Sequence, residues 1–172
     1  LKQEKFRKDS LIDPLTTLAN RRAFRERLEQ SITIEKRQLA VLFVDLDGFK
    51  RVNDEQGHAV GDLVLRQTAR RLEHSVRSND LVARYGGDEF TILLTHLENR
   101  EGTIRTVERI RENIDSPFRT EAGMISLGTS VGVAIYPEDG AEADLLLELA
   151  DKRMYLDKAR RRSLRRTAET AH

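Results

Sequence analysis

The chain has 172 residues, of which 34% are charged, and its 30 Lys and Arg nearly balance its 29 Asp and Glu to leave a net charge of +1. This length allows one domain with a proper core but not two large domains, and the balanced charge argues against a general nucleic-acid binder. The lack of cysteine excludes disulfides and cysteine-ligated metals, and no apolar run approaches the roughly 20 residues that a membrane span needs.

Residues 1–10 are charged and are predicted to form the end of an incoming linker helix, with a frayed tail as the alternative. The chain opens on Leu rather than Met and shows no signal peptide, so we expect a soluble piece of a longer protein. Asn20 is a predicted helix N-cap, because Phe24, Leu28 and Ile32 follow it at intervals of four.

The unbroken apolar run at residues 39–44 predicts a strand that is buried on both faces. Asp45 and Asp47 come directly after it, and they share one side of the strand if the strand continues that far. A short helical piece at residues 48–55 and a longer helix at residues 61–76 are expected next.

The Gly-Gly pair at residues 86–87 lies between apolar runs at residues 81–83 and 90–94. This pattern predicts a tight β-hairpin, because glycine adopts positive φ without steric cost. Asp88 and Glu89 follow immediately, where their charges can stay outside the core. Taken alone, the motif is more typical of an ordinary surface hairpin with acidic residues for solubility.

A helix is expected at residues 104–114, a strand at residues 129–135 and a turn at residues 137–140. The last helix is predicted at residues 141–160, and residues 163–172 are expected to form a disordered basic tail. A hairpin inside an alternating pattern of helices and strands predicts a mixed sheet with helices packed on it.

Asp45 and Asp88 form the strongest candidate constellation. Two carboxylates from neighbouring strand ends can hold a divalent cation, and hard oxygen ligands without His or Cys favour Mg²⁺. The alternative interpretation is that both are acidic caps on strand ends.

Residues 84–90 read Arg-Tyr-Gly-Gly-Asp-Glu-Phe and resemble the signature of the GGDEF family of diguanylate cyclases. The resemblance runs from about Asp13 to Arg162. It departs where a residue replaces the usual glycine or small side chain, at Thr17, Asp157 and Arg161. It implies an α/β (α+β), ferredoxin-like palm of the nucleotide-cyclase type, with a mixed, mostly antiparallel sheet of about five strands surrounded by helices. The implied catalytic domain covers residues 11–162.

By this resemblance, Asp45, the carbonyl of Leu46 and Asp88 would bind Mg²⁺, or Mn²⁺ in its place, with Glu89 close enough to help. The implied reaction is attack of a ribose 3′-OH on an α-phosphate, which a metal ion assists by lowering the pKa of the hydroxyl. Asp88 would accept the proton, with Glu89 beside it.

Asn53 and Asp62 match the family positions that recognise the base. A carboxylate accepts both the N1–H and the N2 amino protons of guanine, and an amide supplies a donor and an acceptor. The alternatives are a turn residue for Asn53 and a helix N-cap for Asp62. His58, between them, either touches the substrate or is structural.

Lys50, Lys158 and Arg162 match family positions that bind the β- and γ-phosphates, although Arg162 is equally explained as part of a solvated tail. Arg77 and Asp80 match the site at which the product, cyclic di-GMP, inhibits the enzyme, since arginine can bind guanine or phosphate with two hydrogen bonds. A charged helix end is the alternative for this pair.

The sequence therefore predicts an enzyme that condenses two GTP into cyclic di-GMP and two pyrophosphates and is subject to product inhibition. Because the product is two-fold symmetric and each half-site holds one GTP, a homodimer is expected, governed by an upstream sensory domain. The expected location is cytoplasmic, as a soluble protein or as part of a membrane-anchored sensor, without membrane or nucleic-acid contact by this segment.

Three alternatives stay open. The first is a catalytically silent regulatory module that binds GTP or cyclic di-GMP, and the second is a structural interaction domain without a nucleotide. The third is an enzyme that makes mixed cyclic dinucleotides, which the carboxylate of Asp62 opposes.

Overall fold

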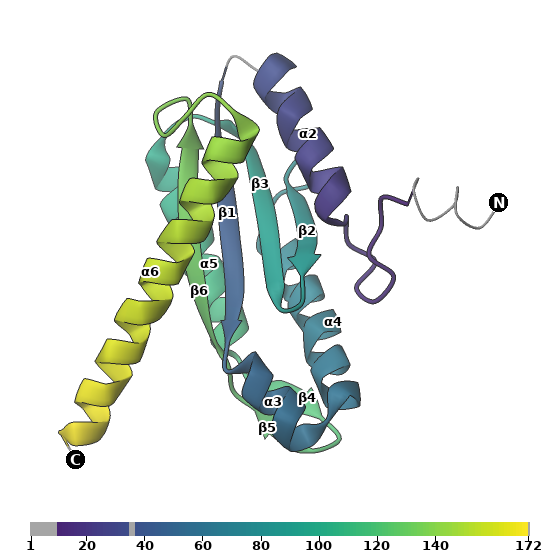
Figure 1. Cartoon of the computed structure of the whole chain (residues 1–172), viewed down its shortest axis with the longest axis vertical. Helices are drawn as coiled ribbons and strands as arrows, with labels where there is room; N and C mark the ends of the chain where they lie inside the picture. Colours follow the sequence, from purple (N-terminus) through teal and green to yellow (C-terminus); the bar gives the residue numbers. More distant parts are fainter. Residues whose placement is uncertain (1–9, 35–36, 172) are drawn as a thin grey trace.

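The structure is a computed structural model that describes residues 10–34 and 37–171, so most of the predicted linker helix (residues 1–9) lies outside the described residues. Figure 1 shows the helices and strands in their spatial arrangement. In chain order they are α2 (Arg21–Ile34), β1 (Gln38–Asp47), α3 (Phe49–Gln56), α4 (His58–His74), β2 (Leu81–Gly86), β3 (Glu89–Leu97), α5 (Arg100–Asp115), β4 (Phe118–Thr120), β5 (Gly123–Ile125), β6 (Gly128–Tyr136) and α6 (Ala143–Thr170).

The main sheet has four strands in the order β2-β3-β1-β6, and all three pairs are antiparallel. The predicted mostly antiparallel α/β architecture is confirmed, with four strands where about five were expected. β4 and β5 form a separate two-stranded hairpin that was not predicted. Each has only three residues, too few for an alternating pattern to identify.

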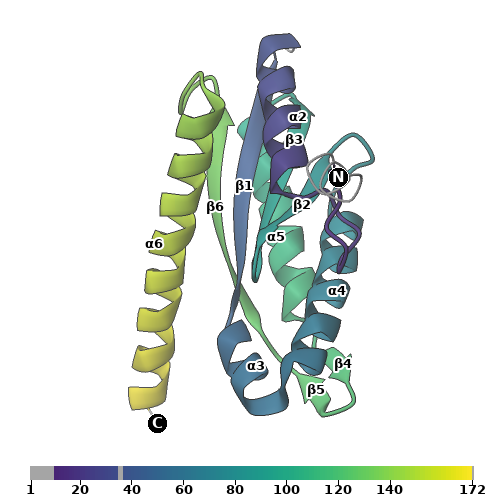
Figure 2. The same ribbon diagram turned by 45° about the vertical axis from the view of Figure 1, so that its right-hand side comes forward.

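The central strand β1 is covered by helices on both faces (Figures 1 and 2). Leu39, Val41 and Phe43 pack in the core cluster that includes residues of α2 and α6. The intervening side chains, such as Leu42 and Val44, pack in the other cluster with residues of α4 and α5. This double burial explains the unbroken apolar run, and the alternation puts Asp45 on the same face as α6.

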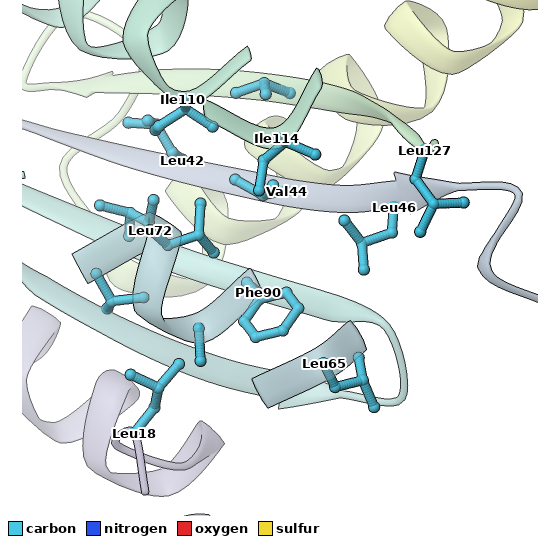
Figure 3. Close-up of a cluster of buried hydrophobic side chains, with 14 of the residues drawn as sticks. Leu18, Leu42, Val44, Leu46, Leu65, Leu72, Phe90, Ile110, Ile114 and Leu127 are labelled. Atoms are coloured by element: carbon cyan, nitrogen blue, oxygen red, sulfur yellow. The ribbon is translucent and has the colours of Figure 1, made fainter. Parts of the chain in front are cut away.

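Figure 3 shows the cluster beneath α4 and α5, where Phe90 of the hairpin and Leu72 of α4 meet the strand β1. The side chain of Leu46 belongs to this cluster and is 1% exposed. The Leu46 side chain therefore belongs to the core, and metal binding by its carbonyl stays a prediction.

Several helix boundaries differ from the prediction, and α5 begins at Arg100, four residues earlier than expected. α4 begins at His58, three residues earlier than expected, after Gly57 with a φ of 89°. α6 continues to Thr170, so the prediction of a disordered tail is wrong for residues 163–170. Ion pairs between Asp47 and two arginines of α6, Arg161 and Arg165, hold the helix against β1. Such long-range pairs cannot be read from local sequence.

Thr17 keeps the left-handed backbone that glycine normally supplies, with a φ of 61°. Its hydroxyl oxygen accepts a 2.9 Å hydrogen bond from Arg70 of α4, which also donates to the carbonyl of Thr16. The left-handed turn is therefore kept without the usual glycine, and α4 holds it in place.

Within residues 10–34 and 37–171, no helix combines the length and the apolar composition required to cross a membrane.

Candidate active site

The hairpin predicted from the two glycines is formed by β2 and β3. Its turn residues are Gly87, with a φ of 47°, and Asp88, one position later than the Gly-Gly pair. The pairing shifts between Arg84 and Gly86, so that Tyr85 is the extra residue of a bulge. This geometry puts Asp88 at the hairpin tip.

Arg84 holds the hairpin tip in place. Its Nε and Nη2 donate hydrogen bonds of 3.0 and 2.9 Å to the carbonyl of Gly87, and its Nη1 lies 3.3 Å from Oδ1 of Asp13. The Asp13 carboxylate also accepts hydrogen bonds from the amide and the hydroxyl of Thr16. The sequence analysis named Arg84 only as part of the signature and Asp13 only as the start of the family resemblance, so this contact at the tip was missed.

Asp45 lies at the end of β1, directly opposite Glu89 of β3, and is 6% exposed. Its Oδ2 accepts a 2.6 Å hydrogen bond from Nζ of Lys158 on α6. Its Oδ1 is buried and has no hydrogen-bond partner among the described residues. One oxygen of this buried carboxylate is therefore available to a further positive group.

Asp88 and Glu89 lie in the electrostatic field of Asp45. Burial, then the charge of the Asp45 carboxylate and the hydrogen-bonding approach of the two carboxyl groups, raise the pKa of Asp88 from 3.8 to about 7. Burial also raises the pKa of Glu89, with smaller effects from Asp151 and Asp45, while Lys158 opposes both shifts. The tip thus gathers negative charge that Lys158 only partly compensates.

These features fit a divalent cation. The Asp45 carboxylate has one oxygen without a hydrogen-bond partner, and its negative charge disfavours ionisation of the neighbouring Asp88 carboxyl group. A divalent cation would bind these oxygens and neutralise their charges. Across the described part of the chain, no three His, Cys, Asp or Glu side chains converge as a metal-ligand cluster. Mg²⁺ needs few protein ligands, because it keeps waters and substrate phosphates around it.

Asp47, the other acidic residue at the end of β1, is already engaged. Its Oδ1 accepts a 2.7 Å hydrogen bond from Ser130, and its Oδ2 lies 3.4 Å from Arg161 and 3.3 Å from Arg165. Asp47 therefore anchors α6 rather than joining the carboxylates at the tip.

Both departures in α6 tie this helix to other elements. Arg161 pairs with Asp47, and Asp157 accepts hydrogen bonds of 2.9 Å from the amide of Val131 and 2.8 Å from Arg111. Burial alone would raise the pKa of Asp157, but these partners lower it overall. The two substitutions thus position the helix that carries Lys158.

Asn53 and Asp62 lie on α3 and α4, the two helices that follow β1 (Figure 1). Asn53 is inside a helix rather than in a turn, and Asp62 is the fifth residue of α4 rather than its N-cap. The two alternatives for these residues are therefore wrong. Both are half-buried, and neither side chain is hydrogen-bonded to a described residue. The Asn53 carboxamide lies against Gly61, the neighbour of Asp62.

Three predicted substrate-binding residues are exposed: Lys50, His58 and Arg162. None of their side chains makes a hydrogen bond or ion pair within the described ranges, so no contact joins them to the carboxylates. Lys158 differs, because it is the predicted phosphate ligand that the structure brings to Asp45.

Arg77 and Asp80 lie in the turn between α4 and β2. The Asp80 carboxylate accepts hydrogen bonds from the amide of Arg77 at 2.9 Å and from the amide of Thr95 at 3.1 Å. The Arg77 side chain is exposed, and both residues line a depression of about 300 Å³. Asp80 thus organises this turn, and its binding of a product stays a prediction.

Comparison with known proteins identifies the same family that the sequence motifs resemble. A family model described as "Diguanylate cyclase, GGDEF domain" matches residues 10–164. The chain is 42% identical over 161 residues to the diguanylate cyclase TpbB of Pseudomonas aeruginosa, covering 91% of this chain and 37% of TpbB. It is 38% identical over 157 residues to the diguanylate cyclase DosC of Escherichia coli, covering 88% of this chain and 34% of DosC.

A solved structure of P. aeruginosa PA1120 (TpbB or YfiN) that comprises only the GGDEF domain superposes with a TM-score of 0.83 at 40% identity. The match covers 87% of this chain and 89% of that one. The chain thus spans less than two fifths of the length of the two curated relatives, 37% and 34%, but most of the length of the solved domain.

Proposed function

This chain belongs to the GGDEF family of diguanylate cyclases, and we propose on that basis that it condenses two GTP into cyclic di-GMP and two pyrophosphates. One observation carries the proposal beyond family membership. The buried Oδ1 of Asp45 lacks a partner beside a second carboxylate, Asp88, whose ionisation is disfavoured. Such a pair supports binding of the cation that phosphoryl transfer from a nucleotide requires.

We assign Asp45, the carbonyl of Leu46 and Asp88 as the groups that would hold Mg²⁺, with Glu89 supporting them through its charge. When bound, Mg²⁺ would lower the pKa of the attacking 3′-OH and neutralise charge on the triphosphate. Asp88 is the proposed proton acceptor, because the carboxylate at the hairpin tip would lie beside the attacking hydroxyl.

Asn53 and Asp62 would recognise guanine. Their polar side chains are half-buried on adjacent helices and have no described hydrogen-bond partner, so both can bind a ligand. A carboxylate at Asp62 accepts the two guanine donors, whereas adenine lacks this donor pair, which favours GTP over ATP.

Lys158 is proposed to move from Asp45 to the triphosphate when the nucleotide arrives. The ammonium group now neutralises Oδ2 of Asp45. A cation held at the free Oδ1 would supply that positive charge instead, so Lys158 could reach the phosphates. Lys50 and Arg162, which are exposed, would supply further positive charge there.

One half-site holds one GTP, so two chains would face each other across the two nucleotides, and activity would depend on dimer formation. We further propose that Arg77 and Asp80 bind cyclic di-GMP as an inhibitor, and that residues 11–162 act as the cytoplasmic catalytic domain of a longer protein.

The test is a GTP turnover assay with Mg²⁺ over a range of protein concentrations, following cyclic di-GMP and pyrophosphate. We expect turnover per chain to rise with concentration and to be abolished by Asp88→Asn. Unchanged turnover in Asp88→Asn would contradict the mechanism. GTP binding without pyrophosphate release, even after enforced dimerisation, would instead identify a silent regulatory module.

A further inference from the structure

We propose that Gly61 positions Asn53 for base recognition, because its missing side chain leaves the space that the Asn53 carboxamide occupies next to the segment that carries Asp62. This inference rests on the proposed function, in which Asn53 and Asp62 read guanine. Gly61 itself is a positioning residue, since it acts through Asn53 and has no side chain to touch the base.

The geometry concerns the junction between α3 and α4, which meet at one end of the sheet in both views of the ribbon (Figures 1 and 2). A Cβ atom added at Gly61 would overlap Oδ1 of Asn53 and would lie 2.9 Å from its Cγ. The next atom, Cζ of Phe49, would lie 3.3 Å away. Only the end of the Asn53 side chain would therefore need to move far.

The backbone does not explain this glycine. Gly61 is the fourth residue of α4 and is absent from the glycines with positive φ, which include Gly57 and Gly87. At an ordinary helical position, alanine forms a helix better than glycine does. Glycine at position 61 therefore makes α4 less stable than alanine would, but it leaves room for the Asn53 carboxamide.

Substitution of Gly61 by alanine should therefore change the stability of α4 and the binding of guanine in opposite directions. An alanine at position 61 would favour α4 but would rotate the Asn53 carboxamide away from the segment that carries Asp62. Asn53 would then lose its hydrogen bonds to guanine, and loss of one or two such bonds corresponds to roughly tenfold weaker binding.

Gly102 offers a matched control. It lies in the first turn of α5, and an added Cβ there would meet no described atom within 4 Å. Gly102→Ala makes the same change in a helix but leaves Asn53 untouched.

The experiment measures binding of guanosine 5′-[α,β-methylene]triphosphate, which cannot release pyrophosphate, by calorimetry, and the melting temperature of each variant. We expect Gly61→Ala and Gly102→Ala to melt no lower than the unsubstituted protein. Only Gly61→Ala should bind the analogue about tenfold more weakly. The double variant Asn53→Ala/Gly61→Ala should bind no more weakly than Asn53→Ala alone.

The outcomes separate this inference from the proposed function. If Asn53→Ala weakens binding and Gly61→Ala does not, the role of Gly61 is wrong and base reading by Asn53 stands. If Asn53→Ala binds the analogue like the unsubstituted protein, the base-reading assignment fails and the inference fails with it. A lower melting temperature for Gly61→Ala would show a packing role instead and would also overturn the inference.

Discussion

At the tip of the β2–β3 hairpin, the position of Asp88 depends on a neighbour that would not itself touch the substrate. Arg84 grips the carbonyl of Gly87 with two nitrogens and reaches Asp13 with a third. The side chains of Arg84 and Asp13 are 18% and 16% exposed, so this contact is largely shielded from solvent. The segment before α2 is thereby connected to the proposed proton acceptor.

Arg84→Lys should lower kcat by about 10- to 100-fold with little change in KM, because a single ammonium group cannot replace the planar fork that positions the tip. Steady-state kinetics measures the split between the two parameters. Arg22→Lys is the matched control, since Arg22 makes only an exposed pair with Glu26 and its substitution should leave kcat unchanged. An Arg84→Lys variant with normal kcat would show that the clamp does not position Asp88.

The raised pKa of Asp88 predicts a pH dependence of folding. The carboxyl group titrates near its ordinary value of 3.8 in the unfolded chain and at about 7 in the metal-free folded domain. Across this window the unfolded chain has released a proton that the folded domain keeps, so this group reduces stability as pH rises. Asp88→Asn removes the effect, and the variant should be more stable than the unsubstituted protein above about pH 7.

Urea unfolding of the two metal-free proteins at several pH values measures this difference. Carboxyl groups with lowered pKa, such as Asp139 beside Arg153, have the opposite effect at lower pH but are common to both proteins. Parallel pH profiles for the two proteins would mean that Asp88 titrates normally in the fold.

At the level of whole elements, α6 is held unusually close to β6. A Cβ atom at Gly132 of β6 would overlap the backbone carbonyl of Ala150 and the backbone nitrogen of Met154 in α6. Unlike the Asn53 side chain at Gly61, these backbone atoms cannot rotate away. α6 also carries Lys158, so this close packing sets the position of the only lysine that contacts Asp45 among the described residues.

Gly132→Ala should therefore push α6 off the sheet and lower the free energy of unfolding by about 1–3 kcal/mol, the usual cost of overpacking. Equilibrium unfolding in urea measures the loss, and Gly102→Ala, which meets open space, is the control. A Gly132→Ala variant as stable as the control would mean that α6 is free to shift.

The sequence predicted elements whose signals are local. The apolar run of β1 and the glycines of the hairpin each indicate one structure by themselves, and both predictions are confirmed. The end of α6 was missed because Asp47, far away in the chain, pairs with Arg161 and Arg165. Likewise, a turn or N-cap role for Asn53 and Asp62 could be excluded only once α3 and α4 had defined bounds.

In the candidate site, too, some features could be predicted from the sequence and others depend on long-range contacts. Carboxylates on neighbouring strand ends were expected for Asp45 and Asp88, and the pairing of β1 with β3 puts Asp45 opposite Glu89. The pairing of Lys158 with Asp45 and the grip of Arg84 on Gly87 depend on side-chain conformations. Motif spacing carries no information on those conformations, so these contacts could not be predicted.

For the molecule as a whole, the proposed reaction requires two copies of this fold. Each copy would supply one set of carboxylates and one guanine site. The chain matches less than two fifths of the length of its two curated relatives, 37% and 34%. Regions outside the match are candidates for bringing the two copies together.

The central claim is that Asp45 and Asp88 jointly hold the divalent cation that serves GTP. The most direct measurement is an anomalous diffraction map of crystals grown with Mn²⁺ and guanosine 5′-[α,β-methylene]triphosphate. We predict a manganese peak within bonding distance of both carboxylates and of a phosphate oxygen of the analogue. A peak that contacts neither carboxylate, or one at Asp47 instead, would contradict the account.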